Sequence, residues 1–300
     1  MFTTVRLLFC KRSSSQSLVR QIGLKLKGKR YCPRRRDCAS ISLGLAMSAN
    51  DFRYALYLTP PPDSDLWRFG CDVIGRDPLT GASREGFSLE GYPPDSWRSM
   101  TSDPRRYGFH ATLKAPFPLR LDLDPADLFD SVAEFAGKHS PFDAGELNVG
   151  VVKAGYGPAF VALKPEGALK ELRSFEAHIV RGLDRLRAPL VESGREYRGS
   201  ERLTPRQAYY LHAWGYPYVL DEFDPHFTLT NAIPDADRVA RLLEWELGLR
   251  VPARTLHVDA LTLLGQNEPG GEFRILRRFL LGRPYRSRRP TRALAAAIFD

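Results

Sequence analysis

The sequence is poor in cysteine and contains no long hydrophobic run. Its four cysteines, Cys10, Cys32, Cys38 and Cys71, form no CxxC pair, so neither a disulfide framework nor a zinc site is indicated. No apolar stretch approaches the roughly 20 residues that span a bilayer, which predicts a soluble protein without a membrane partner. This cysteine usage fits a reducing compartment, and we expect a cytoplasmic protein.

Acidic residues are almost missing from the first fifty positions. Residues 1–50 hold 11 of the 44 Lys and Arg residues but only one acid, Asp37, which leaves 33 basic and 34 acidic residues in 51–300. The net charge of +9 therefore comes from the leader, and the remainder is close to neutral at −1. A neutral body has no general electrostatic reason to bind a polyanion, so we expect a small phosphorylated substrate rather than nucleic acid.

The basic segment 1–50 resembles an organellar transit peptide, and it equally resembles out-of-frame sequence in front of a true start or a functional basic arm. We expect Met47 to be the biological start and the leader to be disordered. The folded domain is predicted over 51–282. A basic tail over 283–300 follows and contains five arginines.

Hydrophobic periodicity predicts strands and helices that alternate through two halves of the chain. Strands are predicted over 53–58, 107–116, 146–152, 159–163, 224–230, 258–264 and 273–280. Helices are predicted over 64–74, 124–135, 169–186, 206–214 and 235–247. The Gly- and Pro-rich segment 76–106 is long enough to predict a functional loop or lid, and the charged stretch 192–202 is predicted to be a linker.

Two predicted strands, one in each half, carry the same tripeptide pattern. His110-Ala111-Thr112 and His226-Phe227-Thr228 each place an imidazole and a hydroxyl two residues apart, which on a strand puts both side chains on one face. A single His-x-Thr is usually a packed core histidine. Two copies in matching strand contexts favour a functional pair.

Such a pair has the groups that phosphodiester cleavage needs. One imidazole can act as base on the attacking oxygen and the other as acid on the leaving oxygen, since histidine titrates near neutral pH. The hydroxyls of Thr112 and Thr228 can bind the phosphate oxygens, and Lys114 extends the same face as a further phosphate contact. Tyr107 and Arg206 are additional candidates. No HxH or HExxH motif is present, so we expect neither a metal nor a cofactor.

The segments YGFHATLKAPF and HFTLT resemble the two-histidine (2H) phosphoesterase superfamily. RYALYLTPP, LWRFG and LTPRQAYYLHAWGYPY are similar to its phosphonate-metabolism-associated branch, and the resemblance covers residues 53–282. It implies a bilobal α+β fold in which two pseudo-symmetric lobes with antiparallel sheets form a central cleft. The family would place an Arg before the second motif and a Gly after it, where this chain has Asp224-Pro225 and Asn231. Because of this departure, the resemblance does not identify the auxiliary residues around His226.

The resemblance also implies a metal-independent hydrolase that acts on cyclic or 2′-linked phosphodiesters. The association of this branch with carbon–phosphorus lyase genes implies a ribose cyclic phosphate as substrate and a link to phosphonate metabolism. Two alternatives stay open. One is a phosphodiesterase acting on 2′,3′-cyclic RNA ends, against which the neutral body argues. The other is a non-catalytic protein that binds phosphorylated ligands.

Overall fold

The computed structural model describes four stretches of the chain, residues 52–153, 159–167, 169–189 and 202–284. The predicted leader, all but the last residue of the predicted linker and nearly all of the predicted tail lie outside these stretches. Across the described ranges, no helix combines the length and the apolar character needed to cross a membrane.

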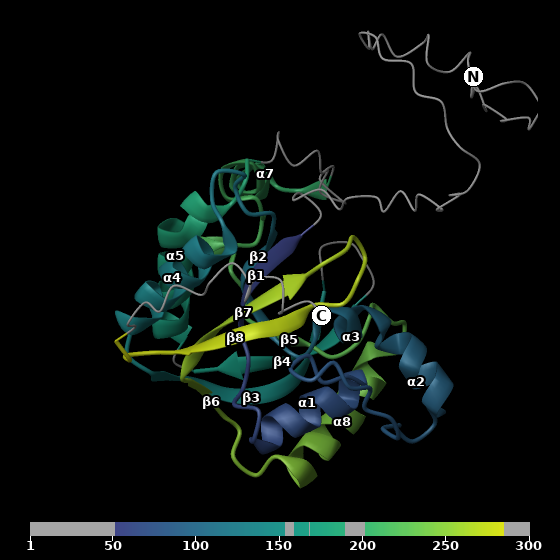
Figure 1. Cartoon of the computed structure of the whole chain (residues 1–300). Helices are drawn as coiled ribbons and strands as arrows, with labels where there is room; N and C mark the ends of the chain where they lie inside the picture. Colours follow the sequence, from purple (N-terminus) through teal and green to yellow (C-terminus); the bar gives the residue numbers. More distant parts are fainter. Residues whose placement is uncertain (1–51, 154–158, 168, 190–201, 285–300) are drawn as a thin grey trace, which may run out of the picture. The chain divides into compact units, whose positions relative to one another are not determined.

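The protein is an α+β structure built on one curled antiparallel sheet (Figure 1). The sheet has eight strands in the order β6-β3-β4-β5-β2-β1-β7-β8. They are β1 Arg53–Leu58, β2 Ala111–Phe117, β3 Phe142–Val152, β4 Phe160–Glu166, β5 Phe227–Thr228, β6 Thr255–Val258, β7 Ala260–Gln266 and β8 Arg274–Leu280. The order separates into two groups of four strands that meet where β5 pairs with β2. The two sheets implied by the resemblance are therefore joined into one.

Helices pack against both groups of strands. They are α1 Asp65–Ile74, α2 Pro94–Met100, α3 Ser102–Tyr107, α4 Pro125–Gly137, α5 Leu169–Leu183, α7 Pro205–Trp214 and α8 Ala236–Arg250. Helix α8 packs on β3, β4 and α1, whereas α4 packs on β7, β8 and α5. The side chains of Ser64, Asp124 and Thr204 cap α1, α4 and α7, since each accepts a hydrogen bond from a backbone N–H of the first turn.

The predicted strand 107–116 begins later than its sequence pattern indicated. Tyr107 is the last residue of α3, and the strand starts at Ala111. Gly108 separates the two elements with a φ of 82°, and a Cβ at this position would lie 2.6 Å from the Cβ of Pro78. The positive φ, combined with a ψ of 167°, and the close approach of Pro78 both require glycine here. The predicted loop 76–106 thus contains two short helices, α2 and α3.

Three further boundaries in the C-terminal half differ from the prediction. The helix predicted to end before Gly248 continues through it to Arg250, because one interior glycine costs only about 1 kcal/mol. The predicted strand 258–264 is divided at Asp259, whose carboxylate forms an ion pair with Arg278 at 2.7 Å. Of the predicted strand 224–230, only Phe227–Thr228 forms a regular strand.

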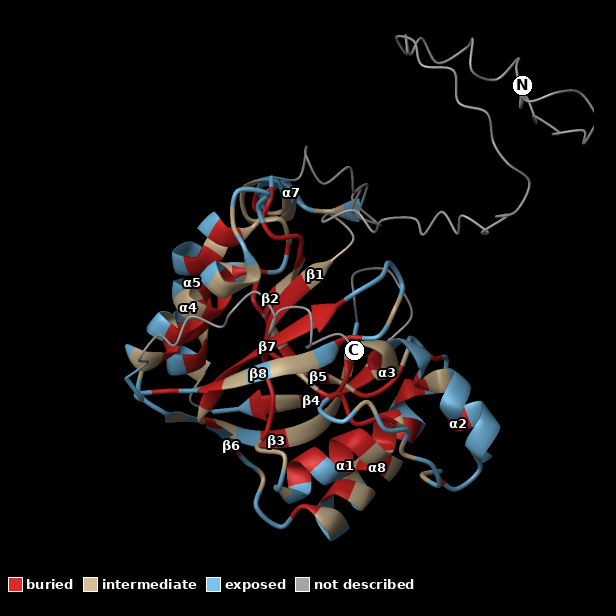
Figure 2. Ribbon diagram, in the orientation of Figure 1, coloured by how far each residue is buried: buried red, intermediate tan, exposed pale blue. Residues whose placement is uncertain are grey.

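The core continues without interruption beneath both His-x-Thr segments. Ala111 and Phe227, the middle residues of the tripeptides, are buried. The ring of Phe109 packs on that of Phe227 with centroids 5.0 Å apart. Figure 2 shows buried residues along the strands and on the helix faces turned toward them. The residues between and beside the functional side chains are therefore held by close packing on the opposite face.

Candidate active site

The register of β2 and β5 brings the two tripeptides together. Ala111 lies opposite Phe227 in an antiparallel pair. Because side chains alternate across a strand, the residues on either side of these two all point to the other face of the sheet. The residues that flank this pair are His110, Thr112, His226 and Thr228. Each histidine thus comes next to the threonine of the other motif as well as its own.

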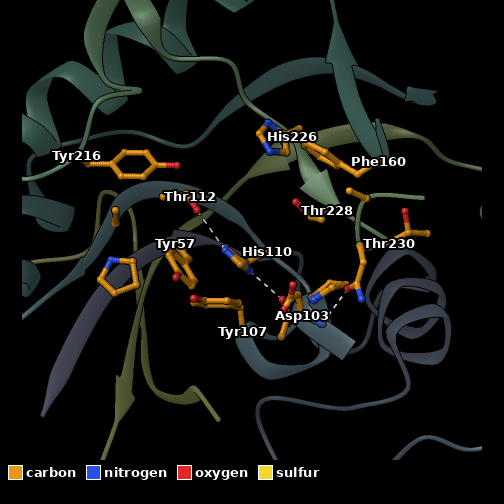
Figure 3. Close-up of a pocket in the computed structure, with 16 residues that line it drawn as sticks. Tyr57, Asp103, Tyr107, His110, Thr112, Phe160, Tyr216, His226, Thr228 and Thr230 are labelled. Carbon is orange, nitrogen blue, oxygen red and sulfur yellow. Dashed lines mark hydrogen bonds between the residues drawn. The ribbon is translucent and has the colours of Figure 1, made fainter. Parts of the chain in front are cut away.

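All four side chains line one pocket with a volume of about 370 Å³ (Figure 3). The pocket is rich in aromatic rings and hydroxyl groups. Its lining comprises Tyr57, Asp103, Pro104, Tyr107, Gly108, His110, Thr112, Ala115, Pro116, Phe160, Tyr216, His226, Thr228, Thr230, Asn231 and Ala232. Among these described residues, only Asp103 carries a formal charge at neutral pH.

The ring of His110 is fixed on both nitrogens. Its Nδ1 lies 2.8 Å from the carbonyl oxygen of Gly108. A carbonyl only accepts, so Nδ1 carries the proton and Nε2 of the neutral ring carries the lone pair. The hydroxyl of Thr112 then donates to Nε2 at 3.2 Å. The ring of Tyr57 stacks on the imidazole with centroids 3.6 Å apart and an interplanar angle of 15°, which holds its plane.

His226 repeats the backbone contact of His110. Its Nδ1 donates to the carbonyl of Asp224 at 2.8 Å, again the residue two positions earlier. Its ring lies beside Phe160, with centroids 5.5 Å apart, and Asp224 forms an ion pair with Lys164 at 2.9 Å. Both imidazoles therefore have the same tautomer, with Nε2 as the basic nitrogen.

Burial lowers the pKa of both histidines. The pKa of His110 falls to about 4, since desolvation and the nearby His226 outweigh the hydrogen bond to Gly108. The pKa of His226 is also lowered by desolvation, which the hydrogen bond to Asp224 and its negative charge oppose. Both rings are thus neutral near pH 7, and His226 has an adjacent carboxylate that favours its protonated form.

Two of the predicted site residues do not line the pocket. Lys114 is buried and pairs with Asp184 at 2.8 Å. The register of β2 against β1 shifts between Thr112 and Lys114, so the alternation of faces that would have brought Lys114 to the pocket is interrupted. Arg206 is exposed on α7 and hydrogen-bonds the carboxylate of Asp221.

Tyr107 lines the pocket, as do several residues that the motifs did not identify. Tyr57 and Tyr216 contribute phenol rings and Phe160 a phenyl ring. Tyr57 reaches the pocket through its pairing in the sheet, where it is the register partner of Thr112. Asn231 had no usable sequence signal, since its contacts with Ser99, Ser102 and Asp103 join segments about 130 positions apart.

Possible metal ligands do not cluster in the part of the chain that the structure describes. There, no group of three or more His, Cys, Asp or Glu side chains lies close enough to hold a metal ion. The two site histidines are accompanied by threonines, so the two tripeptides alone fall short of the three or four ligands that a metal site needs. That the protein needs no metal stays a prediction.

The fold is α+β, and the candidate site consists of two His-x-Thr segments paired in one pocket. The chain belongs to the family DUF1045, described as a protein of unknown function, whose model matches residues 112–274. The match begins at the first threonine of the pair and includes all of the second tripeptide.

Two curated relatives carry the name ribose 1,5-bisphosphate phosphokinase PhnN. The protein from Janthinobacterium sp. (strain Marseille) is 34% identical over 226 residues, which cover 74% of this chain and 49% of the relative. The protein from Laribacter hongkongensis (strain HLHK9) is 30% identical over 238 residues, with coverages of 75% and 51%. The chain thus spans about half the length of these relatives, and the kinase activity in their name belongs to those whole proteins.

Similar solved structures include one titled as a phosphoesterase and E. coli LigT in complex with 3′-AMP. The first has 13% identity and a TM-score of 0.36, and covers 78% of this chain and 99% of the other. LigT has 15% identity and a TM-score of 0.33, with the same coverages. Similarity at this level does not establish what this chain binds or catalyses.

Proposed function

We propose that this protein is a metal-independent phosphodiesterase of the two-histidine type that hydrolyses a small cyclic phosphodiester. The observation that carries the proposal is the pairing of Ala111 with Phe227, which turns both histidines and both threonines into one pocket. An acid and a base on neighbouring strands can act on the two sides of one phosphorus atom.

His110 is the base in this proposal and His226 the acid. Nε2 of His110 has a lone pair down to about pH 4 and takes a proton from water as the water oxygen bonds to phosphorus. The bond from phosphorus to one ester oxygen breaks, and protonated His226 gives its proton to that oxygen. The carboxylate of Asp224 and the anionic substrate both favour the protonated ring of His226.

Thr112 and Thr228 bind the non-bridging phosphate oxygens as charge builds up on them. Thr112 donates to His110 in the free protein, so its hydroxyl must rotate toward the phosphate when substrate enters. This exchange needs no side-chain rearrangement, since a hydroxyl hydrogen reorients freely. The threonines therefore stabilise the transition state without adding charge.

The pocket favours a small monoanionic ligand with a sugar ring. Its described lining contains no Lys or Arg, which suits one phosphodiester charge better than several. Tyr107, Phe160 and Tyr216 offer rings of the kind that pack on sugars. Because the relatives are named for a ribose phosphate, ribose cyclic phosphates are the first class to test, and a link to phosphonate metabolism is part of the proposal.

The test is turnover of a panel of cyclic phosphodiesters followed by ³¹P NMR. The panel contains ribose 1,2-cyclic phosphates, nucleoside 2′,3′-cyclic phosphates and a short RNA with a 2′,3′-cyclic end. We expect ring opening to a phosphomonoester for the ribose phosphates, unchanged by EDTA. No turnover of any compound, together with tight binding of one of them, would instead identify a non-catalytic binding protein.

A further inference from the structure

The segment between α1 and β2 was predicted to be a functional loop or lid, and its contacts make that role more specific. It begins at Arg76, directly after Gly75, which ends α1 in the left-handed conformation. Arg76 is one of the largest fully buried side chains of the described protein, with 2% of its surface exposed. Burying a guanidinium is costly unless its hydrogen-bonding groups find partners, so its contacts identify what the segment is built to hold.

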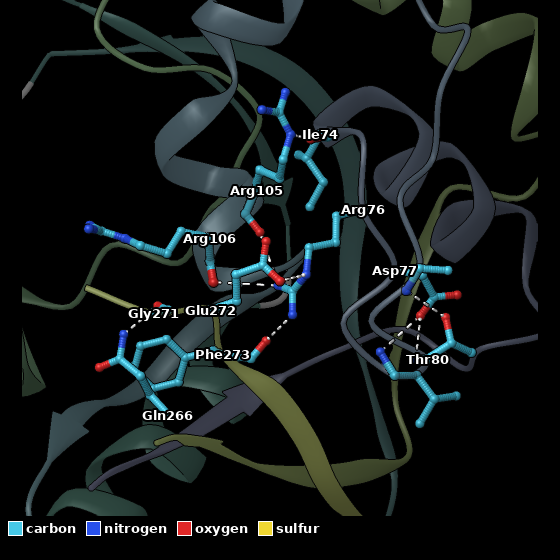
Figure 4. A network of polar contacts seen from close by, with 12 residues as sticks. Ile74, Arg76, Asp77, Thr80, Arg105, Arg106, Gln266, Gly271, Glu272 and Phe273 are labelled. Atoms are coloured by element: carbon cyan, nitrogen blue, oxygen red, sulfur yellow. Dashed lines mark hydrogen bonds and ion pairs between the residues drawn. The ribbon is translucent and has the colours of Figure 1, made fainter. Parts of the chain in front are cut away.

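The guanidinium of Arg76 joins two segments that are far apart in sequence (Figure 4). One amino group donates to the carbonyl of Arg105 in α3 at 3.1 Å. The other donates to the carbonyl of Phe273, in the connection between β7 and β8, at 2.7 Å. Nε lies 2.9 Å from a carboxylate oxygen of Glu272 as an ion pair. A backbone hydrogen bond from Phe273 to Arg106, 2.8 Å long, runs alongside.

The two joined segments both lead to His110. The ring of Phe273 stacks on Tyr107, with centroids 5.3 Å apart and an angle of 18°. It also lies 6.3 Å from Tyr57, the ring that stacks on the imidazole of His110. The carbonyl of Gly108, which accepts from Nδ1 of His110, follows Arg106 by only two residues. The position of this carbonyl therefore depends on where α3 ends.

We propose that Arg76 is a positioning residue for His110. By holding the end of α3 against the β7–β8 connection, it fixes the Gly108 carbonyl that keeps the proton of His110 on Nδ1 and the lone pair on Nε2. The catalytic consequence rests on the function proposed above. The structural consequence, the single tautomer of His110, stands independently of it.

The direct test is ¹⁵N NMR of the histidine rings in Arg76→Met. In the parent protein at pH 7, both site histidines should show protonated Nδ1 and unprotonated Nε2. In the variant, His110 should become a mixture of the two tautomers, as for an imidazole without a fixed acceptor. His226 is an internal control in the same spectrum, because its acceptor, Asp224, is not joined to Arg76.

Arg278→Met is the matched control. Arg278 is likewise a largely buried guanidinium in an ion pair, and it hydrogen-bonds Asp259 and the carbonyl of Thr59 instead of α3. Both variants should melt at a lower temperature, since each leaves a buried carboxylate or carbonyl without its partner. Only Arg76→Met should alter the tautomer of His110. An unaltered tautomer in both variants would overturn the proposal and leave Arg76 a stability residue.

Turnover adds a second readout. Arg76→Met should lower kcat by about 10–10²-fold with little change in KM, because a displaced base impairs chemistry more than binding. Arg76→Lys keeps the charge but lacks the planar fork, so it should show a smaller change of the same kind and replaces Arg76→Met if that variant does not fold. An altered tautomer in a parent protein that turns over no cyclic phosphate would refute the proposed function and leave the positioning role intact.

Discussion

Gly70 in α1 lies against the ring of Phe109, the residue before His110. Adding one methyl group at Gly70 should therefore disturb the site from outside the pocket. A Cβ at Gly70 would lie 2.2 Å from Cδ1 of Phe109. Phe109 is fully buried and packs on Phe227, the residue after His226. Gly70→Ala must therefore push the Phe109 ring, and with it the backbone that carries both histidines.

The magnitude follows from two opposing terms. Alanine is favoured over glycine inside a helix by about 1 kcal/mol, whereas overpacking a close-packed core costs about 1–3 kcal/mol. Gly182→Ala in α5 is the control, because its Cβ would meet the Phe135 ring at an ordinary 3.7 Å and the helical gain is unopposed. We expect Gly70→Ala to be less stable than Gly182→Ala by about 1–3 kcal/mol.

Thermal unfolding and turnover measure the effect. The stability difference corresponds to a Tm lower by about 2–4 °C for each kcal/mol in a domain of this size. A displacement of the histidines by a fraction of an ångström should reduce kcat by about 10–10²-fold in Gly70→Ala and leave Gly182→Ala unchanged. Equal melting temperatures and equal turnover in the two variants would refute the packing argument.

The remaining predictions concern the histidine and threonine side chains of the two tripeptides. Because the pKa of His110 is about 4 when folded and about 6.5 when unfolded, the unfolded chain binds the extra proton more readily and stability falls as the pH drops from 6.5 toward 4. His110→Gln should therefore gain up to about 3 kcal/mol on the parent between pH 7 and 4, seen in urea titrations at several pH values; a constant difference would contradict the lowered pKa. The pH profile of kcat/KM should be bell-shaped with its alkaline limb below pH 6.5, because the pKa of His226 is lowered in the free enzyme; a limb above pH 7 would count against His226 as the acid. Thr112→Val or Thr228→Val should cost about 10–10²-fold in kcat, since each removes one uncharged donor of several; a loss as large as that of a histidine would show that the threonine does more than bind phosphate.

Local sequence patterns were sufficient to predict most of the helices and strands and to identify the two His-x-Thr tripeptides as a candidate functional pair. Hydrophobic periodicity and capping residues identify α1, α4, α5 and α7, because these signals act within a few residues of each other. The side-chain directions of His110 and Thr112 follow from strand alternation in the same way. The register that places them beside His226 does not, since it depends on one pairing, Ala111 with Phe227, across 116 positions.

Of the two predicted site residues that lie outside the pocket, Lys114 has the same explanation. Lys114 was assigned to the pocket by counting alternate positions from His110, and the register shift of β2 against β1 breaks that count. Nothing in the residues themselves reveals the shift, because it is set by the neighbouring strand. The segment 76–106 is a second place where local composition was not sufficient to predict the structure. Its Gly and Pro content predicted a functional loop or lid, and the structure shows that it contains α2 and α3 and that Arg76 hydrogen-bonds both α3 and the β7–β8 connection.

The most direct test of the two-histidine mechanism is the turnover of His110→Ala, His226→Ala and the double variant on the cyclic phosphate that the parent protein hydrolyses fastest. Each single change should lower kcat by about 10²–10⁴-fold, the contribution of a positioned acid or base. The double variant should be little slower than either single one, because the two groups act as a unit. Single variants that retain near-full activity, or loss of the parent activity on adding EDTA, would contradict the mechanism.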